Sequence, residues 1–166
     1  MGRVIVYDLE IEKCVPPANG RREDGVAYCE GWHDHAGMGI SVVCAYDLGE
    51  RRTRVFCRDN LSAFQDLLAR ADLRVGFNNL GFDDKVLAAN GISVPPEDKA
   101  FDLLREMWLS AGLGPEFDAS THAKFGLDRT ARANLGEGKT GHGELAPEQW
   151  QRGKVGSVID YCIADV

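Results

Sequence analysis

The chain has 166 residues, of which 44% are apolar and 27% are charged, and its formal net charge is −7. This composition predicts one folded domain over residues 1–166 and argues against a protein that coats nucleic acid through bulk electrostatics. Neither a run of 18 apolar residues nor a basic-then-apolar leader is present, so we expect no membrane partner and a cytoplasmic location. The five cysteines lack a repeated spacing, which favours reduced thiols over a disulfide framework.

The first predicted element is a buried strand over residues 4–10, Val-Ile-Val-Tyr-Asp-Leu-Glu, which ends in two carboxylates, Asp8 and Glu10. Side chains two positions apart on a strand point the same way, so both acids leave one face. Like charges held close together away from water need a positive partner, and a divalent metal ion is a suitable one. The alternative is a strand that ends at Tyr7, with both acids in a solvated loop.

A long polar stretch follows, and then a predicted hairpin. Residues 12–37 contain glycine and proline without apolar periodicity, which indicates a loop. Two β-rich runs, residues 40–46 and 52–57, are separated by Asp-Leu-Gly-Glu at 47–50, a typical hairpin turn. We therefore expect the first three strands to be sequential and antiparallel.

The rest of the chain alternates helical and strand patterns. It contains a predicted helix over 61–68 with Asn60 at its N-cap, a strand over 73–77, a helix that Asn90-Gly91 ends, a strand over 100–103, a helix around 107–109, an irregular region over 112–143 with a helix near 122–133, and a final helix from Val155. This order predicts an α/β fold in which helices flank a mixed five-stranded sheet.

Two further acidic features stand at element boundaries. Asp83 falls in the first turn of a predicted helix, where a carboxylate often serves only as a cap. Tyr161 and Asp165 are four residues apart on the final helix and so share a face, while Val158 and Cys162 share a neighbouring face that can pack on the sheet. Each feature alone says little about chemistry.

Together the three segments resemble the tyrosine-containing branch of the DEDD exonuclease superfamily, which includes the proofreading domains of family B DNA polymerases. The family's motifs are a strand ending in Asp-x-Glu, then Gly-aromatic-Asn followed by Phe-Asp, then Tyr-x-x-x-Asp. The matching residues are Asp8 and Glu10; Gly76, Phe77, Asn78, Phe82 and Asp83; and Tyr161 and Asp165. Their order and spacing follow the family across essentially the whole chain.

The resemblance implies a ribonuclease H-like fold and a 3′ to 5′ exonuclease that hydrolyses phosphodiester bonds at DNA or RNA ends. Two Mg²⁺ or Mn²⁺ ions per site would serve this reaction, because carboxylate oxygens are the ligands these ions prefer. By resemblance the ligands are Asp8, Glu10, Asp83 and Asp165, and Tyr161 orients the attacking water. The implied partners are single-stranded DNA or RNA 3′ ends, with room for a replication or repair protein in trans.

Substrate contacts are expected from residues beside the acids. Leu9 is expected in the core through its side chain, although the main chain of residues 9–11 could contact the nucleotide, as the family suggests. Asn78 could bond to the backbone or to the substrate, and Phe82 could pack under the terminal base or belong to the core. Asp165 precedes the last residue, Val166, whereas the family's helix continues for several turns, which leaves open a minimal nuclease, a fragment or an impaired form.

Two other functions stay open. The first is a catalytically weak ribonuclease H-like module that binds nucleic acid or a replication or repair partner. The second is an endonuclease or resolvase of the same broad fold, which would need the acids but not Tyr161. A ladder of products shortened from the 3′ end indicates the exonuclease, binding without cleavage indicates the binding module, and internal cuts indicate the endonuclease.

Two cofactor signals are rejected. Residues 133–140 satisfy a relaxed phosphate-loop pattern, but no strand precedes them, so we expect no nucleotide cofactor and interpret Lys139 as a phosphate contact or plain surface. Cys14, Cys29, His33 and His35 lack a recognised zinc spacing, so we do not expect zinc. In the same loop, Trp32 with Arg21 and Arg22 is a better candidate for gripping a single strand. The isolated His122 and His142 are assigned no role.

Overall fold

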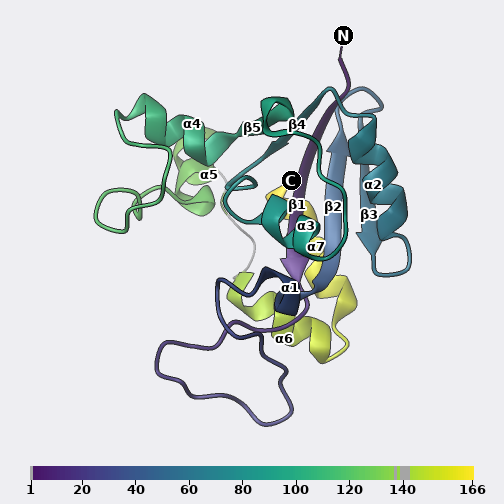
Figure 1. The fold of residues 1–166 in the computed structure, drawn as a ribbon, viewed down its shortest axis with the longest axis vertical. Helices are drawn as coiled ribbons and strands as arrows, with labels where there is room; N and C mark the ends of the chain where they lie inside the picture. The colour runs from purple at the N-terminus through teal and green to yellow at the C-terminus, as the bar shows by residue number, and fades with distance from the viewer. Residues whose placement is uncertain (1, 137, 139–142) are drawn as a thin grey trace.

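A five-stranded sheet forms the centre of the computed structural model, which describes residues 2–136, 138 and 143–166 (Figure 1). Its strand order is β3-β2-β1-β4-β5. The strands are β1 (Val4–Ile11), β2 (Ile40–Asp47), β3 (Arg52–Cys57), β4 (Leu73–Gly76) and β5 (Ala100–Asp102). β1, β2 and β3 pair antiparallel, whereas β4 pairs parallel with both β1 and β5. The predicted mixed α/β sheet, with its first three strands antiparallel, is therefore confirmed.

Helices cover both faces of this sheet. They are α1 (His35–Met38), α2 (Leu61–Ala69), α3 (Asp83–Ala89), α4 (Leu103–Ser110), α5 (Leu127–Leu135), α6 (Ala146–Gln151) and α7 (Val155–Asp165), with 3₁₀ turns η1 (Glu97–Lys99) and η2 (Gly143–Leu145). Figure 1 shows α4 and α5 as a lobe beside the β5 edge, and the segment before α1 as a long loop below the sheet. No helix within the described part of the chain is both long and apolar enough to cross a membrane.

The alternation of β1 separates its apolar side chains from its acids. Ile5, Tyr7 and Leu9 are buried in one core with residues of α2 and α3. The opposite face of the sheet carries a second core, formed by Val42, Cys44, Ala146, Val158, Tyr161 and Cys162. Asp8 and Glu10 alternate with the first set and so lie on the α7 side, as the i, i+2 spacing predicts.

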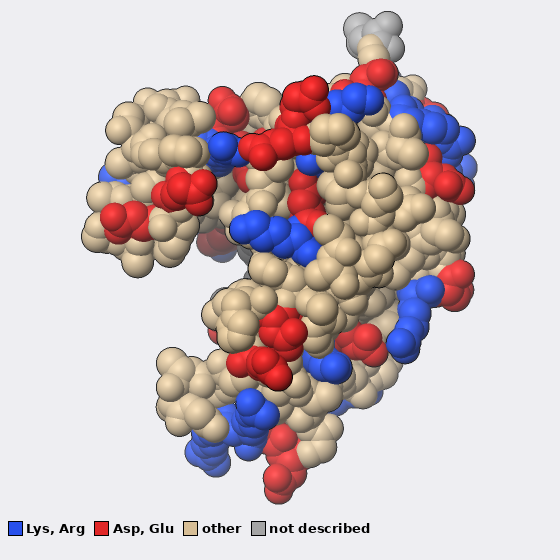
Figure 2. Space-filling view, viewed as in Figure 1, with Lys and Arg blue, Asp and Glu red and all other residues tan. Residues whose placement is uncertain are grey.

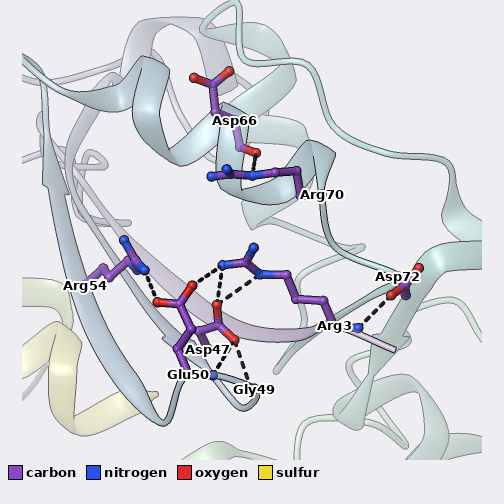
Figure 3. Close-up of polar contacts among 8 residues, drawn as sticks. All are labelled: Arg3, Asp47, Gly49, Glu50, Arg54, Asp66, Arg70 and Asp72. Carbon is purple, nitrogen blue, oxygen red and sulfur yellow. Dashed lines mark hydrogen bonds and ion pairs between the residues drawn. The ribbon is translucent and has the colours of Figure 1, made fainter. Parts of the chain in front are cut away.

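An ion cluster around the buried carboxylate of Asp47 holds the chain at the start of β1 (Figure 3). The guanidinium of Arg3 lies 2.5 Å from the carboxylate of Asp47 and 2.8 Å from that of Glu50. Its backbone N–H donates to Asp72 at 2.6 Å. Burial would raise the pKa of Asp47, but bonds from Arg3 and the Glu50 amide, with the charge of Arg3, outweigh it and leave that pKa below its usual value. The cluster joins β1 to the β2–β3 turn.

Local structure departs from the prediction in the loop regions. α1 interrupts the expected loop because Asp34 caps it, accepting the Gly37 N–H at 2.9 Å. α6 forms between the expected irregular region and the final helix, where no element was predicted, and Pro147 lies in its first turn, a position that suits proline. Asn60 occupies the N-cap of α2, but its side chain accepts from the Cys57 N–H at 2.6 Å instead of capping.

The helix expected near 122–133 begins later, at Leu127, because His122 is used in a turn. Its ring is buried against Trp108, with the ring centroids 4.6 Å apart. Its Nε2 lies 3.0 Å from the Gly114 carbonyl, and its Nδ1 accepts the Asp118 N–H at 3.3 Å. His122 is therefore structural. His142 lies outside the described residues.

Candidate active site

One pocket of about 650 Å³ gathers the residues that the sequence singles out. All five expected catalytic residues line it, namely Asp8, Glu10, Asp83, Tyr161 and Asp165. The expected substrate contacts Leu9, Asn78 and Phe82 line it as well. Lys139 lies outside the described residues.

Asp8 and Glu10 lie close together at the pocket, beside Cys162. Oxygens of both carboxylates and the sulfur of Cys162 lie within 4.8 Å of one another, and Glu10 is buried. Among residues 2–136, 138 and 143–166 this is the one such group, and Asp83 and Asp165 line the same pocket. Nor do Cys14, Cys29, His33 and His35 gather as ligands within that part of the chain.

Cys162 is a neighbour of the site that the sequence interpretation placed only in the core. Its thiol donates to the backbone oxygen of Asp8 at 3.5 Å and lies 3.8 Å from the carboxylate. A hydrogen bond with Cys44, then burial and the charge of Asp8, raise the pKa of Cys162 far above its usual value. The group beside the acids is therefore a neutral thiol, and it joins α7 to β1.

Asp83 is tied directly to the strand that carries the other acids. It is the first residue of α3, and its Oδ1 accepts the backbone N–H of Leu9 at 3.1 Å. Burial, and next the charge of Asp8, raise the pKa of Asp83 well above its usual value. The N–H of Leu9 is thereby used within the protein, and its side chain is buried in the core, 4% exposed.

A buried network on the other side of α3 holds Asp83 in place. Arg74 of β4 is 2% exposed and donates to Asp84 at 2.8 Å through Nη2 and to the Pro96 carbonyl at 2.8 Å through Nη1. The hydroxyl of Tyr7 also donates to Asp84. Because Asp84 follows Asp83, this network fixes the start of α3 against β1 and β4. Sequence reasoning missed it, although an arginine within the apolar run Leu-Arg-Val-Gly was a signal.

The turn before α3 is shaped by Asn78 and Asp102. Asn78 adopts a left-handed conformation with φ of 66°, which asparagine tolerates better than most residues. Its backbone N–H donates to Asp102 at 2.8 Å, and the other Asp102 oxygen accepts from Leu80 at 3.1 Å. Asp102 also caps α4 by accepting the Leu104 N–H at 3.0 Å. This buried carboxylate therefore supports the site without lining its pocket.

Tyr161 and Asp165 come from α7, and the wall facing the tyrosine comes from η2. A methyl group placed on Gly143 would lie 3.0 Å from the Tyr161 hydroxyl oxygen. Glycine therefore permits a close approach of the backbone to that hydroxyl. The sequence interpretation assigned Gly143 no role.

Another wall of the pocket belongs to the long loop after β1. Cys14 to Ala18, Tyr28 and Trp32 line the pocket from this side. Trp32 is 67% exposed, and its ring meets the half-buried ring of Phe82 edge-on, with centroids 6.1 Å apart. Phe82 therefore packs against the core and also lines the pocket.

The fold has a solved counterpart. It is similar to that of the family B DNA polymerase from the hyperthermophilic archaeon Pyrobaculum calidifontis, with a TM-score of 0.61 and 18% sequence identity. The match covers 99% of this chain and 24% of the polymerase chain, so this chain spans about a quarter of that protein. No family model and no curated protein sequence matches the chain. At this identity the comparison establishes the fold: an open α/β sheet of the kind found in that polymerase.

Proposed function

We propose that this protein is a metal-dependent exonuclease that removes nucleotides from the 3′ ends of DNA or RNA. The observation that carries the proposal is the shared pocket. Four carboxylates from β1, α3 and α7, together with Tyr161, line one cavity at the end of a buried strand. A helix cap would account only for Asp83, and a solvated loop only for Asp8 and Glu10, so neither explains why all four carboxylates share one pocket.

The residues present fit hard divalent cations. The donors are carboxylate oxygens, which suit Mg²⁺ and Mn²⁺, and the raised pKa of Asp83 reflects negative charge held out of water beside Asp8. Asp8, Glu10, Asp83 and Asp165 would hold two ions. When bound, the ions would acidify water and stabilise charge on the attacking and leaving oxygens.

The remaining residues position substrate and water. The hydroxyl of Tyr161 orients the attacking water, and the close wall at Gly143 limits where that hydroxyl can move. Phe82 packs against the terminal base, and Asn78 shapes the turn below it. A replication or repair protein in trans is a further proposal, since the polymerase of similar fold contains this unit within a longer chain.

The test uses 5′-labelled single-stranded DNA and RNA with Mg²⁺, Mn²⁺ or chelator. We expect a ladder shortened from the 3′ end that requires metal and disappears in Asp8→Ala. Asp160→Ala is the matched control, because Asp160 is exposed on the same helix as Asp165 and lines no part of the pocket. Cleavage that persists in chelator or in Asp8→Ala refutes the proposal; internal cuts favour an endonuclease, and binding without cleavage favours a binding module.

A further inference from the structure

We infer that residues 12–34, which we call the platform loop, bind an unpaired nucleic-acid strand beside the acids. The ring of Trp32 stacks on the base next to the terminal nucleotide, and Gln151 holds the loop in place. This inference rests on the proposed function and names the substrate of the same site: a nucleic-acid end with exposed base faces. It is carried by contacts of the loop that no catalytic motif requires.

Gln151 of α6 links the platform loop to the body, beside an ion pair between Arg152 and Glu23. Nε2 of Gln151 donates to the carbonyls of Glu12 at 3.0 Å and Ala27 at 3.1 Å. Its Oε1 accepts the Ala27 N–H at 2.7 Å. Gln151 therefore satisfies both backbone groups of Ala27, as a neighbouring strand would.

Backbone hydrogen bonds across the platform loop add to the bonds made by Gln151. Cys14 donates to the Ala27 carbonyl at 3.1 Å, and Cys29 donates to the Cys14 carbonyl at 3.0 Å. Cys14 and Tyr28, which these bonds bring together, both line the pocket. The platform loop is thus a built wall of the site, although it contains no regular element.

Trp32 is the residue that this wall presents. Its ring is two-thirds exposed although it lines the pocket, and an exposed aromatic face is what base stacking requires. The Trp32 ring contacts the ring of Phe82, and Phe82 directly precedes Asp83. We therefore place Phe82 nearer the acids and Trp32 on the outer side of Phe82. The terminal nucleotide would therefore lie by Phe82, and the next base would reach Trp32.

Charge favours a strand that crosses the platform loop from outside. Figure 2 shows Lys and Arg side chains, beside acidic ones, at the lower end of the molecule, where Figure 1 places this loop. Arg21 and Arg22 are exposed in it, and the Arg22 guanidinium carbon lies 5.3 Å from the centre of the Tyr28 ring. These cations would attract the phosphates of the strand, which the carboxylates of the pocket repel. A duplex covers its base faces with neighbouring pairs, so the platform loop selects an unpaired end.

The first test measures binding of 5′-fluorescein oligothymidylate by fluorescence anisotropy in Ca²⁺. Stacking free energies predict that Trp32→Ala raises Kd about 5-fold to 100-fold. Trp32→Phe should retain most of the affinity, and Phe117→Ala should match wild type, because Phe117 is comparably exposed (64%) but does not line this pocket. Blunt duplex of equal length should bind with no dependence on Trp32. Wild-type affinity in Trp32→Ala overturns the inference.

The second test compares a long substrate with one that cannot reach the platform loop. Thymidine 5′-(p-nitrophenyl phosphate) carries one nucleoside and offers no second base to Trp32. Trp32→Ala and Gln151→Glu should therefore raise KM several-fold more on oligothymidylate than on this small substrate. Gln151→Glu keeps an acceptor for the Ala27 N–H but loses the hydrogen bonds that Nε2 donates to Glu12, Cys14 and Ala27. Gln149→Ala, on the same helix, is its control.

The outcomes separate the two proposals. Equal losses on both substrates would make Trp32 and Gln151 merely structural and overturn the inference. If Asp8→Ala affects hydrolysis of neither substrate, the exonuclease proposal fails, and the anisotropy measurement alone then decides on the platform loop. Oligouridylate in parallel shows whether stacking extends to RNA.

Discussion

Replacing Arg74 by methionine tests whether the network behind α3 holds the candidate site together. The arginine is 2% exposed, its partner Asp84 has a side chain 12% exposed, and two of its nitrogens lie 2.8 and 3.2 Å from one Asp84 oxygen. Methionine fills similar volume but leaves that carboxylate buried without its cation. Breaking a buried pair in this way costs about 3–5 kcal/mol, so we expect a loss of this size in the free energy of unfolding.

Urea denaturation measures the loss, and a double-mutant cycle assigns it to the pair. Asp84→Asn alone should also destabilise, because it leaves Arg74 buried with a weaker partner. The double variant should be more stable than the sum of the two single changes predicts, with a coupling above about 1 kcal/mol. Exonuclease activity should fall in both single variants, because Asp83 begins the same helix.

The control is Arg132→Met, which removes the partner of Asp128 in a pair that is 64% and 44% exposed. We expect its urea midpoint to match wild type, because exposed pairs are screened by water. Loss of less than about 1 kcal/mol in Arg74→Met, or strictly additive single changes, would refute this account of how Asp83 is held.

Three further outcomes follow from the site and the sheet. Gly143→Ala should lower exonuclease turnover with little change in melting temperature, because the new methyl group would lie 3.0 Å from the Tyr161 hydroxyl oxygen and must displace it. Asp47→Asn should destabilise the protein at pH 7, and its difference in stability from wild type should shrink below about pH 4. A carboxylate whose pKa is lowered by folding stabilises the fold above the pKa of the unfolded chain, and this stabilisation is lost as the pH falls through the pKa of the folded protein. Urea midpoints at pH 7 and pH 3 measure the change. Mn²⁺ at about 100 times its Kd should stabilise the fold by about 2.7 kcal/mol in thermal denaturation, and Asp8→Ala should lose most of this.

Each of these has a distinct contrary result. Gly156→Ala, where no atom lies within 4 Å of the added methyl group, is the control for Gly143→Ala and should keep full turnover. An Asp47→Asn deficit that stays constant from pH 7 to pH 3 would remove Asp47 as the titrating group. Equal stabilisation of wild type and Asp8→Ala by Mn²⁺ would locate metal binding elsewhere.

Short-range patterns in the sequence predicted the sheet well. Alternation along residues 4–10 placed Asp8 and Glu10 on one face, and the turn at 47–50 predicted the β2–β3 hairpin, because both follow from local geometry. The same patterns placed α2 and α7 within a residue or two of their observed bounds. Helical and strand periodicity carries this information over windows of only a few residues.

The support of the site could not be predicted in this way. Gln151 and Ala27 are 124 residues apart, and Cys162 and Asp8 are 154 apart, so no local pattern links them. α6 has only six residues, too few for a helical period to show. The Arg74–Asp84 pair shows in sequence only as one charge in a strand and one beside Asp83. Contacts of this kind emerge only from the packed fold.

The most direct test of the proposed centre is anomalous diffraction from crystals grown with Mn²⁺ and thymidine 5′-monophosphate. We predict two manganese peaks, about 3.5–4 Å apart, among the carboxylates of Asp8, Glu10, Asp83 and Asp165. The nucleotide should lie beside Phe82. Peaks elsewhere on the molecule, or no peak between these acids, would contradict the assignment of this pocket as a two-metal nuclease site.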